Sequence, residues 1–97
     1  MFGITITPSA RDDLRRLRKY VRQQIGDAID AQLTYEPDRE TRNRKRLQPN
    51  SLSEWELRIG SYRVFYVIER TGRQVLIVAV GQKQGEKVII RGREYTL

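Results

Sequence analysis

The first part of the chain carries a pattern of apolar residues that predicts one strand and one helix. Apolar and polar residues alternate over residues 2–7, as they do in a half-buried strand. Thr7 followed by Pro8 is typical of a helix start, with threonine as the capping residue. Apolar residues then recur three or four positions apart, which gives one helix face made by Ala10, Leu14, Leu17 and Val21.

A second helical segment follows, with apolar residues again spaced as on one helix face. Its apolar residues extend from Ile25 to Leu33, and we predict that Gly26 interrupts the helical pattern. Pro37 ends it, because a proline disfavours helical geometry in the residue before it. We therefore expect a strand followed by a helical hairpin or by one bent helix.

After residue 47 the apolar residues recur at every second position, which predicts strands. Residues 60–61 are a two-residue turn signal, and the nearly all-apolar residues 74–80 predict a central strand that is covered on both faces and ended by Gly81. The predicted strands cover residues 54–59, 62–68, 74–80, 87–91 and 93–97. The pattern predicts an α+β fold in one domain over residues 1–97, with two N-terminal helices packed on one face of a small, mainly antiparallel sheet of about 4–6 strands.

Composition narrows the kinds of function. The 97 residues include 19 Lys and Arg against 12 Asp and Glu, and the net charge of +7 favours an anionic partner such as nucleic acid. The absence of cysteine and histidine excludes disulfides, Cys- or His-ligated metals and Ser-His-Asp triads. Because no apolar run is long enough to span a membrane, we expect a cytoplasmic protein with no membrane partner. We also expect no cofactor and no metal.

A tight turn at residues 60–61 would fix the register of the central hairpin. Arg58 would then lie directly opposite Arg63 on the face that points away from the helices, where like charges repel. Either Glu54 and Glu56 neutralise the two arginines, or this face holds an external anion such as phosphate. The other face is apolar and is expected to pack on the helices through Trp55, Leu57, Ile59, Tyr62, Val64, Tyr66 and Ile68.

Residues 55–66, WELRIGSYRVFY, resemble the central hairpin of the RelE/ParE-type toxins of bacterial toxin–antitoxin modules, which carries an L-R-x-G-x-Y-R-V-x-Y-like pattern. Residues 75–83 resemble the strand end of these toxins, residues 7–14 the start of their first helix, and residues 41–47 the basic segment before their sheet. The resemblance implies a compact antiparallel sheet with two N-terminal helices. It also implies a cognate antitoxin as partner. RelE-like members cut mRNA on the ribosome, whereas ParE-like members inhibit DNA gyrase.

The resemblance also implies roles for residues on the hairpin face. Arg63 matches the strand arginine that contacts the scissile phosphate, and Lys83 stands where RelE has a second arginine. Arg58 adds positive potential on the same face. Glu54 and Glu56 stand where RelE carries lysines, so we expect them either to act as a base or to repel phosphate. The implied reaction is attack by a 2′-hydroxyl on the phosphodiester, without a metal.

A cluster of basic residues before the hairpin predicts contacts with the backbone of rRNA or mRNA, which need no base readout. The alternative is a flexible basic loop. The cluster consists of Arg39, Arg42, Arg44, Lys45 and Arg46.

The aromatic residues fall into two groups by their strand parity. Phe65 lies on the outward face, where it is expected to stack on a base or to meet an apolar antitoxin residue. RelE has a C-terminal tyrosine, and here Ile89 falls near its place. Tyr95 replaces it only if the tail folds back, and otherwise packs structurally. Structural roles are expected for Trp55, Tyr62 and Tyr66.

These observations lead to a first hypothesis and two alternatives. The first is a toxin that acts as a ribosome-dependent mRNA endoribonuclease, with the ribosome, mRNA and an antitoxin as partners. The second is a ParE-like gyrase inhibitor, or a catalytically inactive member that binds antitoxin or nucleic acid. The third is a basic RNA-binding domain without toxicity.

Overall fold

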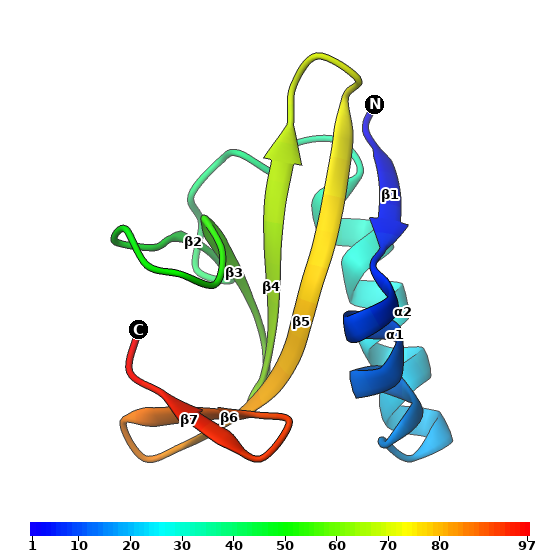
Figure 1. The fold of residues 1–97 in the computed structure, drawn as a ribbon. Helices are drawn as coiled ribbons and strands as arrows, with labels where there is room; N and C mark the ends of the chain where they lie inside the picture. Colours follow the sequence, from blue (N-terminus) through cyan, green and yellow to red (C-terminus); the bar gives the residue numbers. More distant parts are fainter.

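The computed structural model describes all 97 residues as two helices and one open sheet of seven strands (Figure 1). The helices are α1 (Pro8–Arg15) and α2 (Lys19–Leu33). The strands are β1 (Gly3–Ile6), β2 (Arg44–Arg46), β3 (Trp55–Ile59), β4 (Tyr62–Glu69), β5 (Gln74–Gln84), β6 (Lys87–Ile90) and β7 (Arg93–Tyr95). Strands β2 to β7 are neighbours in chain order and antiparallel, and β1 pairs with β5 in parallel. The predicted fold class is confirmed, with one strand, β2, beyond the expected number.

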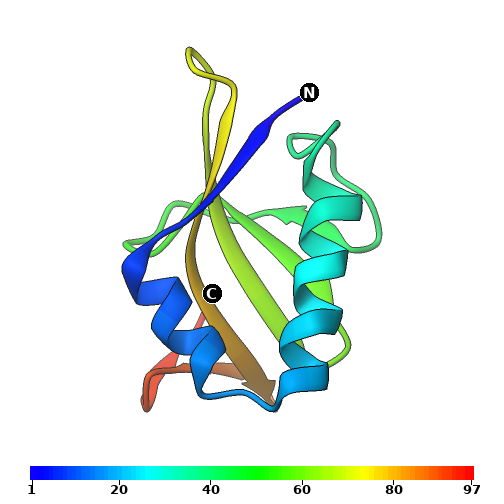
Figure 2. The same ribbon diagram turned by 90° about the vertical axis from the view of Figure 1, so that its right-hand side faces the viewer.

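The sheet buries both faces, each in its own apolar cluster. The larger cluster lies between the sheet and the two helices, which together cover one face (Figure 2). It includes the predicted apolar face of the central hairpin, with Trp55, Leu57, Val64 and Tyr66 almost fully buried. The smaller cluster lies on the opposite face, where the β6–β7 hairpin folds back over one end of the sheet (Figure 1). It is formed by Phe65, Ala79, Val88 and Ile90.

The break between the helices lies at residues 16–18, so the prediction of an interruption at Gly26 was wrong. Arg18 has extended backbone geometry (ψ 150°), and α2 then continues through Gly26 to Leu33. One straight helix over residues 8–33 would be about 39 Å long, whereas the longest dimension of the molecule is 33 Å. The bend keeps the helical region within these dimensions. Bending at residues 16–18 keeps Leu14, Leu17 and Val21 against the same core. Neither helix has the length and apolar character needed to cross a membrane.

Because Gly26 lies inside a continuous helix, replacing it by alanine is expected to stabilise the protein. An added Cβ would have no atom within 4 Å, so the change introduces no clash. We expect Gly26→Ala to raise the free energy of unfolding by about 1 kcal/mol and the Tm by about 4–8 °C, measured by thermal denaturation. Gly81→Ala is the matched control, since its Cβ would lie 2.6 Å from Ile90 Cγ1 and must destabilise. Equal or lower stability of Gly26→Ala would contradict this account of α2.

The register of the central hairpin is the predicted one. Leu57 pairs with Val64 and Arg58 with Arg63 across the turn at residues 60–61, where Gly60 has φ +58°. The prediction that Gly81 ends β5 was wrong, because the strand continues to Gln84. Gly81 instead permits close packing by β6, since any side chain there would collide with residues 88–90.

Candidate functional site

The sheet face opposite the helices contains a cleft of about 100 Å³ in which basic residues from three strands meet. Lys45 comes from β2, Arg58 from β3 and Lys83 from β5. Two carboxylates, Glu56 and Glu86, and apolar residues complete the lining. The full lining consists of Lys45, Leu47, Glu56, Arg58, Lys83, Glu86, Val88 and Leu97. The structure thus brings together three of the residues predicted to be catalytic, Arg58, Lys83 and Glu56.

Lys45 is the cleft residue whose place the sequence analysis missed. It was assigned to a general RNA-binding cluster, but it pairs with Glu56 across β2 and β3 and faces the cleft. A three-residue strand of only Arg and Lys shows no alternation of apolar and polar residues, so its pairing leaves no pattern in the sequence. The only available signal was the family pattern of cations on this face.

Glu56 bridges the two arginines that face each other across the hairpin, and its single negative charge offsets one of their two positive charges. Its Oε2 accepts a hydrogen bond from Arg58 Nε at 2.9 Å, and its Oε1 lies 3.9 Å from Arg63 Nε. The side chains of Glu56 and Arg63 are only 8% and 10% exposed, so water screens this interaction weakly. The predicted intramolecular pairing is present through Glu56 and without Glu54, and this face keeps a net positive charge.

Arg63 is held within the protein. Its Nη1 donates to the carbonyl oxygens of Gly60 and Tyr62, at 2.8 and 2.9 Å, and so braces the turn of the hairpin. Burial lowers the pKa of the Arg63 guanidinium, while the charge of Glu56 opposes this shift. Among the predicted cationic residues, Arg58 is the more accessible of the hairpin pair, with 38% of its side chain exposed.

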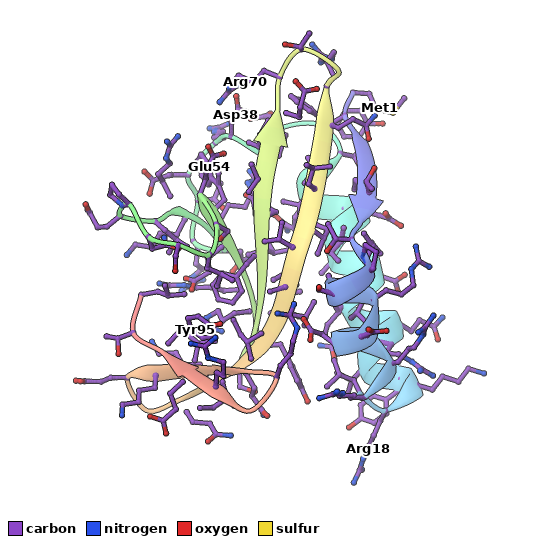
Figure 3. The ribbon with its side chains drawn as sticks, in the orientation of Figure 1. Met1, Arg18, Asp38, Glu54, Arg70 and Tyr95 are labelled. Atoms are coloured by element: carbon purple, nitrogen blue, oxygen red, sulfur yellow. The ribbon has the colours of Figure 1, made fainter.

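Glu54 lies apart from this cleft. It precedes β3, and its Oε1 accepts a long hydrogen bond of 3.4 Å from the backbone N–H of Ile68. It lines a separate hollow formed by the loop of residues 46–54 and Val67. Figure 3 shows Glu54 far from Tyr95 and the C-terminal hairpin. Glu56 is therefore the one predicted carboxylate that reaches the cleft.

The basic cluster that precedes the hairpin divides into buried and exposed members. Arg44 is 9% exposed and donates to Gln32 O at 2.7 Å, Gln32 Oε1 at 2.9 Å and Arg39 O at 2.9 Å. A cation that satisfies carbonyls near the end of α2 stabilises that helix end. Arg44 is thus turned inward, and its charge is not exposed for the predicted contact with RNA.

The other four members of the cluster are exposed, with different partners. Arg39 forms an ion pair with Glu36, and the Arg46 guanidinium lies over the Trp55 ring, 5.7 Å from its centroid. Arg42 forms no ion pair in the structure, and Lys45 faces the cleft. Arg39 is thus the one exposed member with an ion-pair partner, and the charges of the other three have none.

Packing accounts for three of the aromatic residues, Phe65, Tyr66 and Tyr95. Phe65 is fully buried beneath the β6–β7 hairpin, so it cannot stack on a base or meet a partner as proposed from the sequence. Tyr66 is also fully buried, its hydroxyl donates to Pro37 O at 2.7 Å, and burial raises its pKa. The tail does fold back, but Tyr95 packs against the Phe65 cluster and does not line the cleft. Ile89 lies outside the cleft, in a pocket on the helix side.

Comparison with known proteins places the chain in a family. Residues 4–86 match the family described as the ParE toxin of the type II toxin–antitoxin system parDE. The fold is similar to the RelBE2 toxin–antitoxin complex from Mycobacterium tuberculosis, with a TM-score of 0.73 and 26% identity over 84% of this chain and 98% of that chain. It is also similar in fold to the intact E. coli RelBE complex, with a TM-score of 0.52 and 17% identity over 87% and 99%. No curated protein sequence matches the chain.

Both solved structures are complexes of a toxin with its antitoxin. The family match covers most of the chain, including both helices and the strands that form the cleft. The chain therefore belongs to the ParE toxin family and is the toxin of a type II toxin–antitoxin system.

Proposed function

We propose that this toxin is a ribosome-dependent endoribonuclease that cuts mRNA at the cleft of Lys45, Arg58 and Lys83. The observation that carries the proposal is the convergence of these three cations, from three strands, around Glu56. The cleft lies on the sheet face opposite the two helices, beside the β6–β7 hairpin. Cations gathered in this way suit the phosphate backbone of RNA.

The chemistry that fits these residues is attack by the 2′-hydroxyl on its adjacent phosphate. Glu56 takes the proton from the 2′-hydroxyl, and Arg58 and Lys45 stabilise the charge on the phosphorane. The bond from the 2′-oxygen to phosphorus forms as the bond from phosphorus to the 5′-oxygen breaks, and Lys83 donates a proton to that oxygen. The products are a 2′,3′-cyclic phosphate and a 5′-hydroxyl end. Arg63 braces the hairpin that carries Glu56 and Arg58.

The ribosome supplies what this shallow cleft lacks, which is a fixed position for the RNA strand. Positioning of reacting groups can contribute several kcal/mol to a rate enhancement. We expect the purified toxin to leave naked mRNA intact and to cut the same mRNA when it is being translated. The measurement is electrophoresis of a labelled mRNA with and without translating ribosomes. Cleavage of naked mRNA at an equal rate would contradict the proposed dependence on the ribosome.

Gyrase inhibition is the second candidate, and two observations favour it. The matched family is named for ParE toxins, and the strand arginine Arg63 is engaged within the hairpin instead of exposed. This candidate predicts that the toxin blocks supercoiling of a relaxed plasmid by purified gyrase while mRNA in a translation extract stays intact. Normal supercoiling at toxin concentrations that stop translation would exclude it.

A further inference from the structure

A hollow of about 490 Å³ lies beside the cleft, between the loop that joins β2 to β3 and Val67 of β4. The loop projects from the edge of the sheet that these strands form (Figure 1). We call this space the loop hollow, and it is lined by residues 46–54 and Val67. Leu47 lines both the loop hollow and the cleft, so the two sites adjoin.

The loop is held in shape by Asn50, so the hollow exists before a ligand binds. Asn50 Nδ2 donates to Gln48 O at 2.7 Å and to Ser53 O at 2.9 Å. Asn50 Oδ1 accepts from the backbone N–H groups of Leu52, at 2.7 Å, and Ser53, at 3.0 Å. A preformed hollow of this volume falls within the range of about 300–1,000 Å³ that is typical of small-ligand sites.

The loop hollow combines apolar walls with polar groups that have no strong partner in the protein. Leu47, Leu52 and Val67 are partly exposed and supply the apolar surface. Glu54 forms no ion pair, and its one hydrogen bond, from Ile68 N–H to Oε1, is long at 3.4 Å, so Oε2 is free to accept. The Gln48 side-chain amide also lines the hollow and forms no hydrogen bond within the protein.

The cation of the loop hollow does not neutralise its carboxylate. Arg46 lines the hollow, but its guanidinium lies over the Trp55 ring and forms no ion pair with Glu54. A carboxylate only accepts hydrogen bonds, whereas an amide both donates and accepts them. The hollow therefore offers one strong acceptor, one adaptable amide and apolar walls, which together suit a flat ring that carries an amino group.

We propose that the loop hollow binds an unpaired RNA base that carries an exocyclic amino group, and that it rejects uracil. The inference rests on the proposed nuclease function, because Glu54 precedes Glu56 of the cleft by two residues, about 7 Å along an extended chain. Unpaired bases are read by hydrogen bonds to their Watson–Crick edges and by packing against apolar side chains. Glu54 accepts from the amino group, and Gln48 meets the neighbouring ring nitrogen. Uracil has carbonyl oxygens in place of an amino group, and Glu54 repels them.

The test measures binding without ribosomes, so that it does not depend on cleavage. The ¹⁵N-labelled protein is titrated with 2′-O-methyl trinucleotides of cytidine or of uridine, which carry equal charge and have no free 2′-hydroxyl for the cutting reaction. We expect saturable NMR shifts at Leu52, Glu54 and Val67, and about tenfold tighter binding of the cytidine trinucleotide. Equal affinity, or no shifts at these residues at millimolar concentration, would overturn the proposal.

Two variants separate the loop hollow from overall charge. Glu54→Gln should remove the preference and strengthen binding of the uridine trinucleotide, because an amide can donate to the uracil O4 as well as accept from an amino group. Glu40→Gln is the matched control, since Glu40 is exposed, forms no ion pair and lines neither site. It should keep the wild-type preference. Equal effects of the two variants would overturn the proposal, because net charge would then control the preference.

The outcome for the loop hollow is distinct from the outcome for the cleft. A preference for cytidine that depends on Glu54 would support the base site even if translated mRNA stayed intact. Cleavage of translated mRNA by a toxin that binds both trinucleotides equally would support the nuclease and overturn the base site.

Discussion

Glu56→Gln is expected to lower the free energy of unfolding by about 3 kcal/mol, the cost of leaving a buried charge without its partner. Arg58 and Arg63 face each other across β3 and β4, and Glu56 supplies the one carboxylate that pairs with both. Arg63 cannot turn to solvent, because it is bound to the carbonyls of Gly60 and Tyr62. The measurement is urea denaturation followed by circular dichroism, and the loss should persist at high salt because the pair is buried.

A double-mutant cycle separates charge from packing in this test. Removing both buried charges, with Glu56→Gln and Arg63→Met together, should recover part of the stability lost in Glu56→Gln. Glu54→Gln is the matched control: the side chain is exposed and lies outside the cleft, so we expect a change within about 0.5 kcal/mol. A Glu56→Gln protein as stable as the wild type would show that Glu56 does not hold the two arginines.

Lys83→Met is expected to reduce mRNA cleavage in a translation extract about a hundredfold, as when a general acid is removed from an active site. Lys45→Met should act in the same direction, because Lys45 lines the cleft with Lys83. Cleavage rates are measured from the decay of a labelled reporter mRNA. Circular dichroism of each variant confirms that the fold is retained.

Lys87→Met is the matched control for the cleft variants. It removes the same charge from the same hairpin, but Lys87 lies outside the cleft lining and forms an exposed ion pair with Glu94 at 2.8 Å. Its cleavage rate should stay close to that of the wild type. If Lys87→Met loses as much activity as Lys83→Met, then net charge, and not the geometry of the cleft, controls cleavage.

Much of the fold could be predicted because local signals and packing agree. The turn at residues 60–61 and the alternation around it determined the register of β3 and β4, which the structure confirms. The helix break could not be predicted, since the apolar spacing continues from Leu14 across it to Val21. Gly81 was misinterpreted because a glycine that permits close packing and a glycine that ends a strand look alike in sequence.

The candidate site was harder to predict than the fold, because it depends on which way charged side chains turn. The alternation of residues along the strands predicted that Arg58, Arg63 and Glu56 share one face. It did not predict that Arg63 turns inward to the carbonyls of its own hairpin. Arg44 and Lys45 are adjacent in one basic run, yet one is buried beneath α2 and the other faces the cleft. Hydrogen bonds to distant carbonyls decide such differences, and they leave no trace in local composition.

The central claim is that the cleft of Lys45, Arg58 and Lys83 cuts translated mRNA. The most direct measurement maps mRNA 5′ ends in a translation extract that contains the wild-type toxin or its Lys83→Met variant. We expect new 5′-hydroxyl ends within translated codons for the wild type, and very few of them for the variant. Intact mRNA with the folded wild-type toxin, or the same ends at the same rate with Lys83→Met, would contradict the claim.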